Sequence, residues 1–165
     1  MGAAVAVLNS FDTDRWNSEV YGAMALAARF SALVKDRAAT YQLVYRLWKL
    51  DHTLDVFTKH IHEVMEDANQ QIAEMPTEKK VVEVSQTLRR LHKMVSGIYE
   101  PARIAGLTNS SFTSPVVNSI HKHADDILEL AEWVELFLEP ESLETIFRRA
   151  DGEVARGDII SLSEI

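Results

Sequence analysis

Residues 81–98 read VVEVSQTLRRLHKMVSGI and carry an apolar residue at alternating steps of three and four. This spacing returns the apolar side chains to one face of an α-helix, because the helix turns once every 3.6 residues or about 100° per residue. The pattern continues to Ala105 and recurs in residues 16–34, 43–68 and 117–138. Four amphipathic helices with apolar faces turned to a shared core are therefore predicted.

The ends of these helices are marked unevenly. Pro76 and Thr77 precede the third helix as a stop and an N-cap, and Ser114 and Pro115 provide an N-cap followed by proline for the fourth, so residues 106–114 are predicted to be a loop. The junction at residues 35–40 has neither glycine nor proline. Whether the first and second helices are continuous stays open.

The third helix is predicted to be kinked. Pro101 lies four residues after Gly97 and lacks the N–H that would bond to the carbonyl of Gly97. Short connections between long helices favour antiparallel neighbours, so the predicted fold is all-α, an up-and-down four-helix bundle over residues 1–139. Residues 140–165 are predicted to add a short fifth helix, at 140–150, and a C-terminal tail.

Composition narrows the class of protein. The 165 residues are 47% hydrophobic and 25% charged, as in a globular domain. No apolar run is long enough for a membrane span and the apolar start at residues 3–8 is too short for a signal peptide, so no membrane partner and a cytoplasmic location are expected. The absence of cysteine excludes disulfides, thiolate zinc sites and cysteine nucleophiles.

The net charge of -8 lies in the last quarter of the chain. Residues 1–123 hold 14 Lys and Arg against 13 Asp and Glu, whereas residues 124–165 hold 3 against 12. Nucleic acid is not expected as a partner, because no large basic face is available to neutralise phosphates. The third helix is rich in bases and the fourth carries acids on its outer side, so the two helices should attract each other as antiparallel neighbours. The expected acidic residues are Asp125, Asp126, Glu129, Glu132, Glu135 and Glu139.

An apolar cluster lies on the wrong side of the second helix. Tyr41, Val44, Tyr45 and Trp48 fall opposite its core-facing residues, as do Trp133 and Leu136 on the fourth helix. Large exposed aromatic patches are uncommon on monomers. Either the terminal segments of the chain cover these residues, or they form an interface with another subunit.

Two histidine–carboxylate pairs have a spacing that could serve a metal ion. His62 with Glu66 and His121 with Asp125 stand four residues apart, so each pair shares one helix face. Neither pair belongs to a Glu-x-x-His di-iron motif, and Glu66 stands where a His-Glu-x-x-His zinc motif needs its second histidine. These pairs are weak metal candidates, and no metal or cofactor is predicted.

Two short segments resemble known families. Arg46 and His52 have the spacing of the HEPN ribonucleases, which are helical-bundle enzymes, although Leu47 replaces their usual polar residue. Residues 156–165, RGDIISLSEI, resemble the ending of small bacterial type II antitoxins, with Ser163 at a place that is usually acidic. The second resemblance implies a segment that folds on a partner protein. Its docking residues would be Ile159, Ile160 and Leu162.

The sequence therefore predicts a non-enzymatic helical protein, expected to be bacterial, that associates with itself as a homo-oligomer or with a partner protein. Tyr41, Tyr45 and Trp48 are the predicted anchors, because aromatic side chains remove much apolar area from water at a low cost in side-chain entropy. The alternative is a helical metal-binding protein or a HEPN-like ribonuclease.

Overall fold

The computed structural model describes residues 13–68, 78–136, 138 and 140–156, and among them the side chains of 18–59, 78–136, 138 and 140–152. This part of the chain is all-helical, as predicted. Its helices are α2 (Thr13–Lys35), α3 (Thr40–Ala68), α4 (Glu78–Ser96), α5 (Tyr99–Ile104), α6 (Ser114–Glu135) and α7 (Pro140–Arg156).

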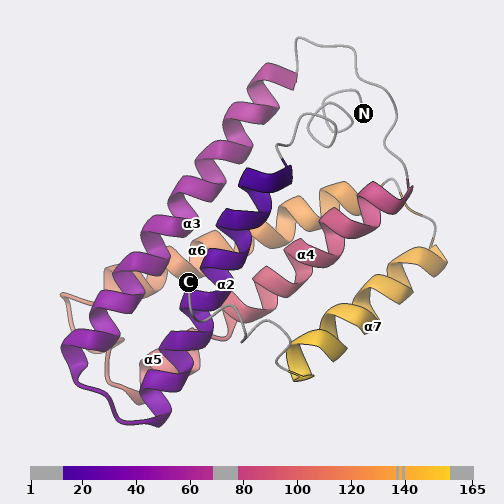
Figure 1. The fold of residues 1–165 in the computed structure, drawn as a ribbon. Coiled ribbons are helices and arrows are strands. Elements are labelled where there is room, and N and C mark those ends of the chain that lie inside the picture. Colours follow the sequence, from indigo (N-terminus) through magenta and orange to yellow (C-terminus); the bar gives the residue numbers. More distant parts are fainter. Residues whose placement is uncertain (1–12, 69–77, 137, 139, 157–165) are drawn as a thin grey trace.

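The longer helices pack in pairs. Figure 1 shows α2 and α3 as an antiparallel pair joined by a tight turn, with α7 lying against the outer side of α4. α2 also contacts α4, and α6 contacts both α3 and α4. Basic α4 and acidic α6 thus lie side by side, as their charges predicted. No helix within the described ranges is long and apolar enough to cross a membrane.

The predicted apolar faces form the core. Their larger side chains are almost fully excluded from solvent, as expected for residues spaced to face inward. The largest buried side chains are Met24, Phe30, Leu47, Leu50, Leu54, Phe57, Leu88, Leu91, Ile98, Ile120 and Ile127.

The sequence left open whether the first two helices are continuous. The structure shows that a turn separates α2 from α3. The N–H of Ala38 bonds to the carbonyl of Leu33 at 3.0 Å and that of Arg37 bonds to the carbonyl of Val34 at 3.2 Å. This is the Schellman pattern that ends a helix, and it requires a left-handed residue, here Arg37 at φ 55°. Glycine usually fills this place, and its absence concealed the helix end.

The third predicted helix is represented by two helices, α4 and α5, with residues 97 and 98 between them. Pro101 has no N–H for the carbonyl of Gly97, which explains why regular α-helical bonding lapses there. α5 then ends in a second Schellman turn, with Gly106 at φ 79° and the N–H of Leu107 bonded to the carbonyl of Ala102 at 2.9 Å.

The start of α6 differs by one residue from the prediction. Its N-cap is Thr113 rather than Ser114, and the Thr113 side chain makes no capping bond. Instead, the buried Thr113 hydroxyl donates to the carbonyl oxygen of Leu107, which ties the two ends of the preceding loop together. Pro115 lies in the first turn of α6, where the missing N–H has no intrahelical partner to lose.

Candidate functional site

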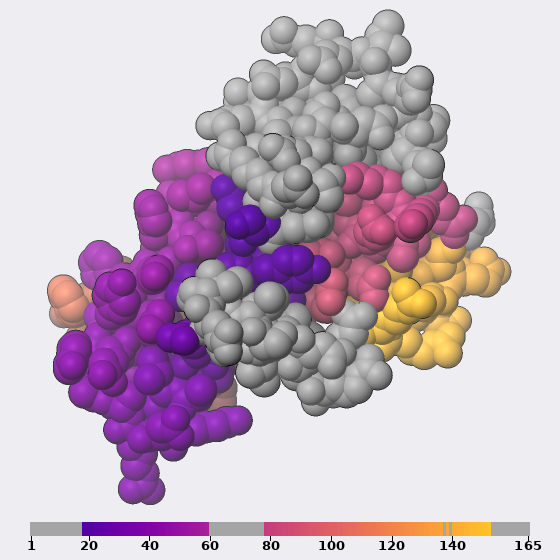
Figure 2. All heavy atoms as spheres, viewed as in Figure 1, coloured from indigo at the N-terminus to yellow at the C-terminus, as the bar shows by residue number. Residues whose placement is uncertain are grey.

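The predicted aromatic anchors form one continuous line on the outside of α3. Tyr41, Tyr45 and Trp48 are 73%, 58% and 50% exposed. Their spacing of four and then three residues places them on one helix face, opposite the buried Leu47 and Leu50. We call these three residues the aromatic stripe. Side chains of α3 line one edge of the molecule in Figure 2, while α7 lies at the other.

Phe112 extends the aromatic stripe and was missed by the sequence analysis. Its ring centroid lies 5.9 Å from that of Trp48, and the side chain is 67% exposed. The loop is held by the bond of Thr113 to Leu107 and by the N–H of Phe112, which donates to Ser110 Oγ at 3.1 Å. The sequence did show Phe112 as a lone aromatic residue among small polar ones. Residue spacing, however, cannot predict which helix a loop residue will contact.

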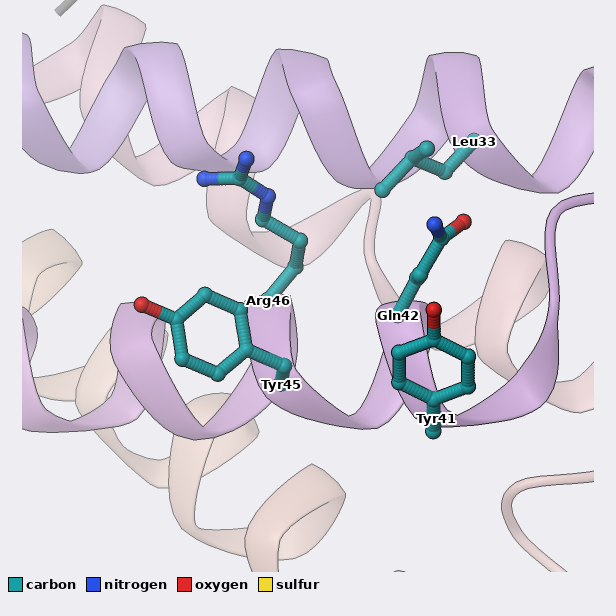
Figure 3. A pocket seen from close by; sticks show the side chains of 5 residues that line it. All are labelled: Leu33, Tyr41, Gln42, Tyr45 and Arg46. Carbon is teal, nitrogen blue, oxygen red and sulfur yellow. The ribbon is translucent and has the colours of Figure 1, made fainter.

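A shallow hollow of about 290 Å³ lies beside the aromatic stripe. Figure 3 shows the side chains that line it, and the Arg46 guanidinium lies 5.8 Å from the centroid of the Tyr45 ring. The volume suits a protein side chain rather than a drug-sized ligand. Aromatic faces, hydroxyls, an amide and a guanidinium together suit an apolar or carboxylate side chain. The lining residues are Leu33, Tyr41, Gln42, Tyr45 and Arg46.

The other predicted interaction residues differ in their exposure to solvent. Leu136 is 67% exposed, as expected. Trp133 is half-buried and packs against the core, so its predicted place on the outer side of the helix needs correction: a large ring near a helix edge reaches back over the core. Ile159, Ile160 and Leu162, and with them the antitoxin-like ending, lie outside the described residues.

A buried ion pair joins α4 to α6 beneath α7. Arg89 Nε and Nη2 each donate to a carboxylate oxygen of Glu135 at 2.7 Å, and the Arg89 guanidinium lies 4.6 Å from the centroid of the Phe147 ring. Glu135 is 5% exposed, so its predicted place on the solvated acidic face is wrong. The bonds to Glu135 raise the pKa of Arg89 above its ordinary value. The two parallel hydrogen bonds from the Arg89 guanidinium explain how the Glu135 side chain tolerates burial.

A groove of about 410 Å³ runs between α4 and α7. Two of its cations are paired within the chain, Arg89 with Glu135 and Lys93 with Asp151. His92 Nδ1 lies 2.9 Å from the carbonyl oxygen of Ala124, so this nitrogen carries the proton and donates. These contacts hold α7 and α6 against α4.

The histidines do not assemble a catalytic or metal site within the described side chains. His52 is exposed, and Arg46 leaves α3 about 120° around the helix from it. His121 and Asp125 are both exposed on α6, whereas the side chains of His62 and Glu66 lie outside the described set. No group of three or more His, Asp or Glu suited to a metal occurs among the described side chains.

One histidine contact was not anticipated. His123 Nε2 lies 3.5 Å from Asp51 Oδ1, bridging α6 and α3, and the two side chains are 12% and 28% exposed. The second ring nitrogen, Nδ1, is buried. The imidazole of His123 therefore lies between α6 and α3, with Nε2 toward the buried Asp51 Oδ1.

No protein-family model matches the chain, and no curated protein or solved structure matches it. Among the described side chains, the aromatic stripe with its hollow is a surface that combines exposed aromatic rings with a guanidinium. Aromatic rings beside a guanidinium are the groups that protein interfaces favour.

Proposed function

We propose that this chain is a non-enzymatic helical association protein that binds a second copy of itself through the aromatic stripe of α3. The observation that carries the proposal is the exposure of Tyr41, Tyr45 and Trp48 along one helix face, extended by Phe112. A monomeric protein seldom exposes so many aromatic side chains in one patch. Because these rings have few rotatable bonds, ordering them at an interface has a low entropic cost.

We further propose that the scaffold is an up-and-down four-helix bundle built from α2, α3, α6 and the α4–α5 pair. The support is the contact pattern, in which α2 and α6 each touch both α3 and α4. In this arrangement α4 and α5 together form one kinked helix, broken where Pro101 withholds a hydrogen bond. The bundle would present the aromatic stripe on a rigid element, which suits an interface.

The absolute mass of the protein in solution, measured by light scattering across a range of concentrations, tests self-association. We expect at least twice the chain mass of 18.6 kDa at high concentration. Tyr45→Lys and Trp48→Lys should shift the mass to that of the monomer, because each places a charge in the interface. A wild-type protein that is monomeric at all concentrations would overturn the proposal.

Tyr99→Lys provides the matched control. Tyr99 is 46% exposed on α5, close to the exposure of Tyr45, but it lies outside the aromatic stripe. Tyr99→Lys should therefore leave the mass unchanged. If all three variants fold and behave alike, the aromatic stripe is not the interface.

A further inference from the structure

A second exposed line of side chains has the same spacing as the aromatic stripe. On α6, Asp125, Glu129, Glu132 and Leu136 follow one another at steps of four, three and four, and all are exposed. We call them the acidic stripe. On α3, the aromatic stripe continues to the exposed His52 with the same steps. Each line therefore occupies about 16 Å of one helix face.

The two lines differ in chemistry in a complementary way. Tyrosine hydroxyls, the indole N–H and the arginine beside them are donors, whereas the carboxylates of the acidic stripe accept. Residues 41–52, which carry the aromatic stripe and His52, hold two bases, Arg46 and Lys49, against one acid, Asp51. α6 exposes four acids, Asp125, Asp126, Glu129 and Glu132, against Lys122, whereas its fifth acid, Glu135, is buried against Arg89. Two copies of the acidic stripe would bring like charges together.

The chain itself contains an example of the contact that such a pairing would make. At the α4–α6–α7 junction, Arg89 lies over the Phe147 ring and is completed by the Glu135 carboxylate. On α3, Arg46 lies beside the Tyr45 ring, and no described carboxylate completes it. An acidic residue from another molecule would supply the third group.

Resting on the proposed self-association, we infer that the aromatic stripe of one copy binds the acidic stripe of a second copy as an antiparallel helix pair. Tyr41 then meets Leu136, the apolar end of the acidic stripe. Tyr45 and Trp48 meet Glu132 and Glu129. His52 meets Asp125 at the far end.

Such an interface is heterologous, because it joins two different surfaces. Each pair of copies keeps one unused surface of each kind, so assembly either closes into a ring or continues as a chain. Its affinity falls with added salt, since both surfaces are exposed and charged. A symmetric contact between two aromatic stripes would instead stop at a dimer.

Disulfide trapping provides the decisive test, because the chain has no cysteine of its own. Tyr41→Cys and Leu136→Cys are prepared separately, one of them isotope-labelled, then mixed, oxidised and examined by intact-mass spectrometry. Both positions are well exposed, so neither change should disturb the fold. We expect the mixed disulfide dimer to exceed either self-disulfide at least tenfold. Ser18→Cys, at an exposed position on α2, is the control for random collision.

The other outcomes are distinguishable. Self-disulfides of Tyr41→Cys in place of the mixed product would overturn this pairing and leave self-association through two aromatic stripes. Absence of any specific disulfide in a protein that still self-associates would overturn the pairing alone. Absence of disulfides in a protein that is monomeric by light scattering would overturn the proposed function as well.

Charge reversal gives an independent measurement. Glu129→Lys with Glu132→Lys should weaken self-association at least tenfold, and so should Arg46→Glu with Lys49→Glu. Mixing the two double variants should restore association, because each retains the surface that the other lacks. Glu144→Lys, on the exposed side of α7, is the matched control. Failure of the mixture to associate, when each variant is folded, would contradict the pairing.

Discussion

Two regions of this molecule bring a guanidinium against an aromatic ring, and they differ in what completes the contact. Arg89 lies 4.6 Å from the Phe147 ring centroid and is held by Glu135 through two bonds of 2.7 Å. Arg46 lies 5.8 Å from the Tyr45 ring centroid, with no carboxylate among its described partners. The first region fastens helices within one molecule. The second lies beside the exposed ring of Tyr45, so the same pair of groups occurs both in a contact between helices and at the surface.

The largest effect on stability is expected at Arg89, where the Glu135 carboxylate completes the contact between guanidinium and ring. Glu135→Gln removes the charge that balances Arg89 and should destabilise the fold by about 3 kcal/mol, the low end for a broken buried pair, because Arg89 keeps some contact with solvent. Urea unfolding followed by circular dichroism measures the change. Self-association should be unaffected at concentrations where the variant is folded.

Two controls define what this result means. Glu100→Gln breaks an exposed pair with Arg103 on α5 and should leave stability almost unchanged, because solvent screens this pair. Replacing both partners, Arg89→Met with Glu135→Leu, should be milder than Glu135→Gln alone, because no charge is left buried. If Glu135→Gln instead changes stability only slightly, the Arg89–Glu135 pair contributes no more to stability than an exposed ion pair does.

A smaller loss is expected at the turn that precedes the Phe112 loop. Gly106 has φ 79°, a conformation that disfavours a Cβ, although open space surrounds the position. Gly106→Ala should therefore destabilise the protein by about 1 kcal/mol through the backbone alone. Thermal unfolding measures the loss. If Gly106→Ala also weakens self-association, the position of the loop, and with it Phe112, contributes to the aromatic surface.

Periodicity predicted most of the fold. The core-facing residues of α3, α4 and α6 were identified because burial depends on which face a residue occupies, and spacing reports that directly. Helix ends were less predictable: the left-handed turn at Arg37 has no glycine to mark it, and the N-cap of α6 is displaced because Thr113 bonds elsewhere. Helix ends of this kind depend on residues outside the helix or on a strained backbone conformation, which the periodicity of the helix does not report.

The candidate site was predicted to the extent that it lies on one helix. Tyr41, Tyr45 and Trp48 were placed together by spacing alone, and their exposure is confirmed. Phe112 and the burial of Glu135 were missed, because both result from contacts between elements. A wheel of one helix cannot reveal that an acid on its flank meets a base from the neighbouring helix.

A small gain is expected at the turn that precedes Tyr41. Arg37 occupies a left-handed conformation at φ 55°, which glycine adopts without steric cost. Arg37→Gly should stabilise the fold by about 0.5 kcal/mol, since relief of the strain is partly offset by the greater freedom of the unfolded chain. Urea unfolding measures this change, and Arg37→Val, with a β-branched side chain at the same φ, should shift stability in the opposite direction. A destabilised Arg37→Gly would show that the arginine side chain makes a contact worth more than the strain.

The smallest effect concerns the acid that α3 itself carries near the aromatic stripe. Asp55 forms an ion pair of 2.9 Å with Lys59, and this hydrogen bond lowers the pKa of Asp55 below its ordinary value of 3.8. A carboxyl whose pKa is lower in the folded state contributes stability above its unfolded pKa and loses it as the pH falls through the folded pKa. Lys59→Gln should therefore raise the pKa of Asp55 toward 3.8, as followed by NMR titration, and weaken the pH dependence of stability below about pH 4. An unchanged pKa would mean that Lys59 does not hold Asp55 in solution, which would leave this carboxylate available to another cation of α3.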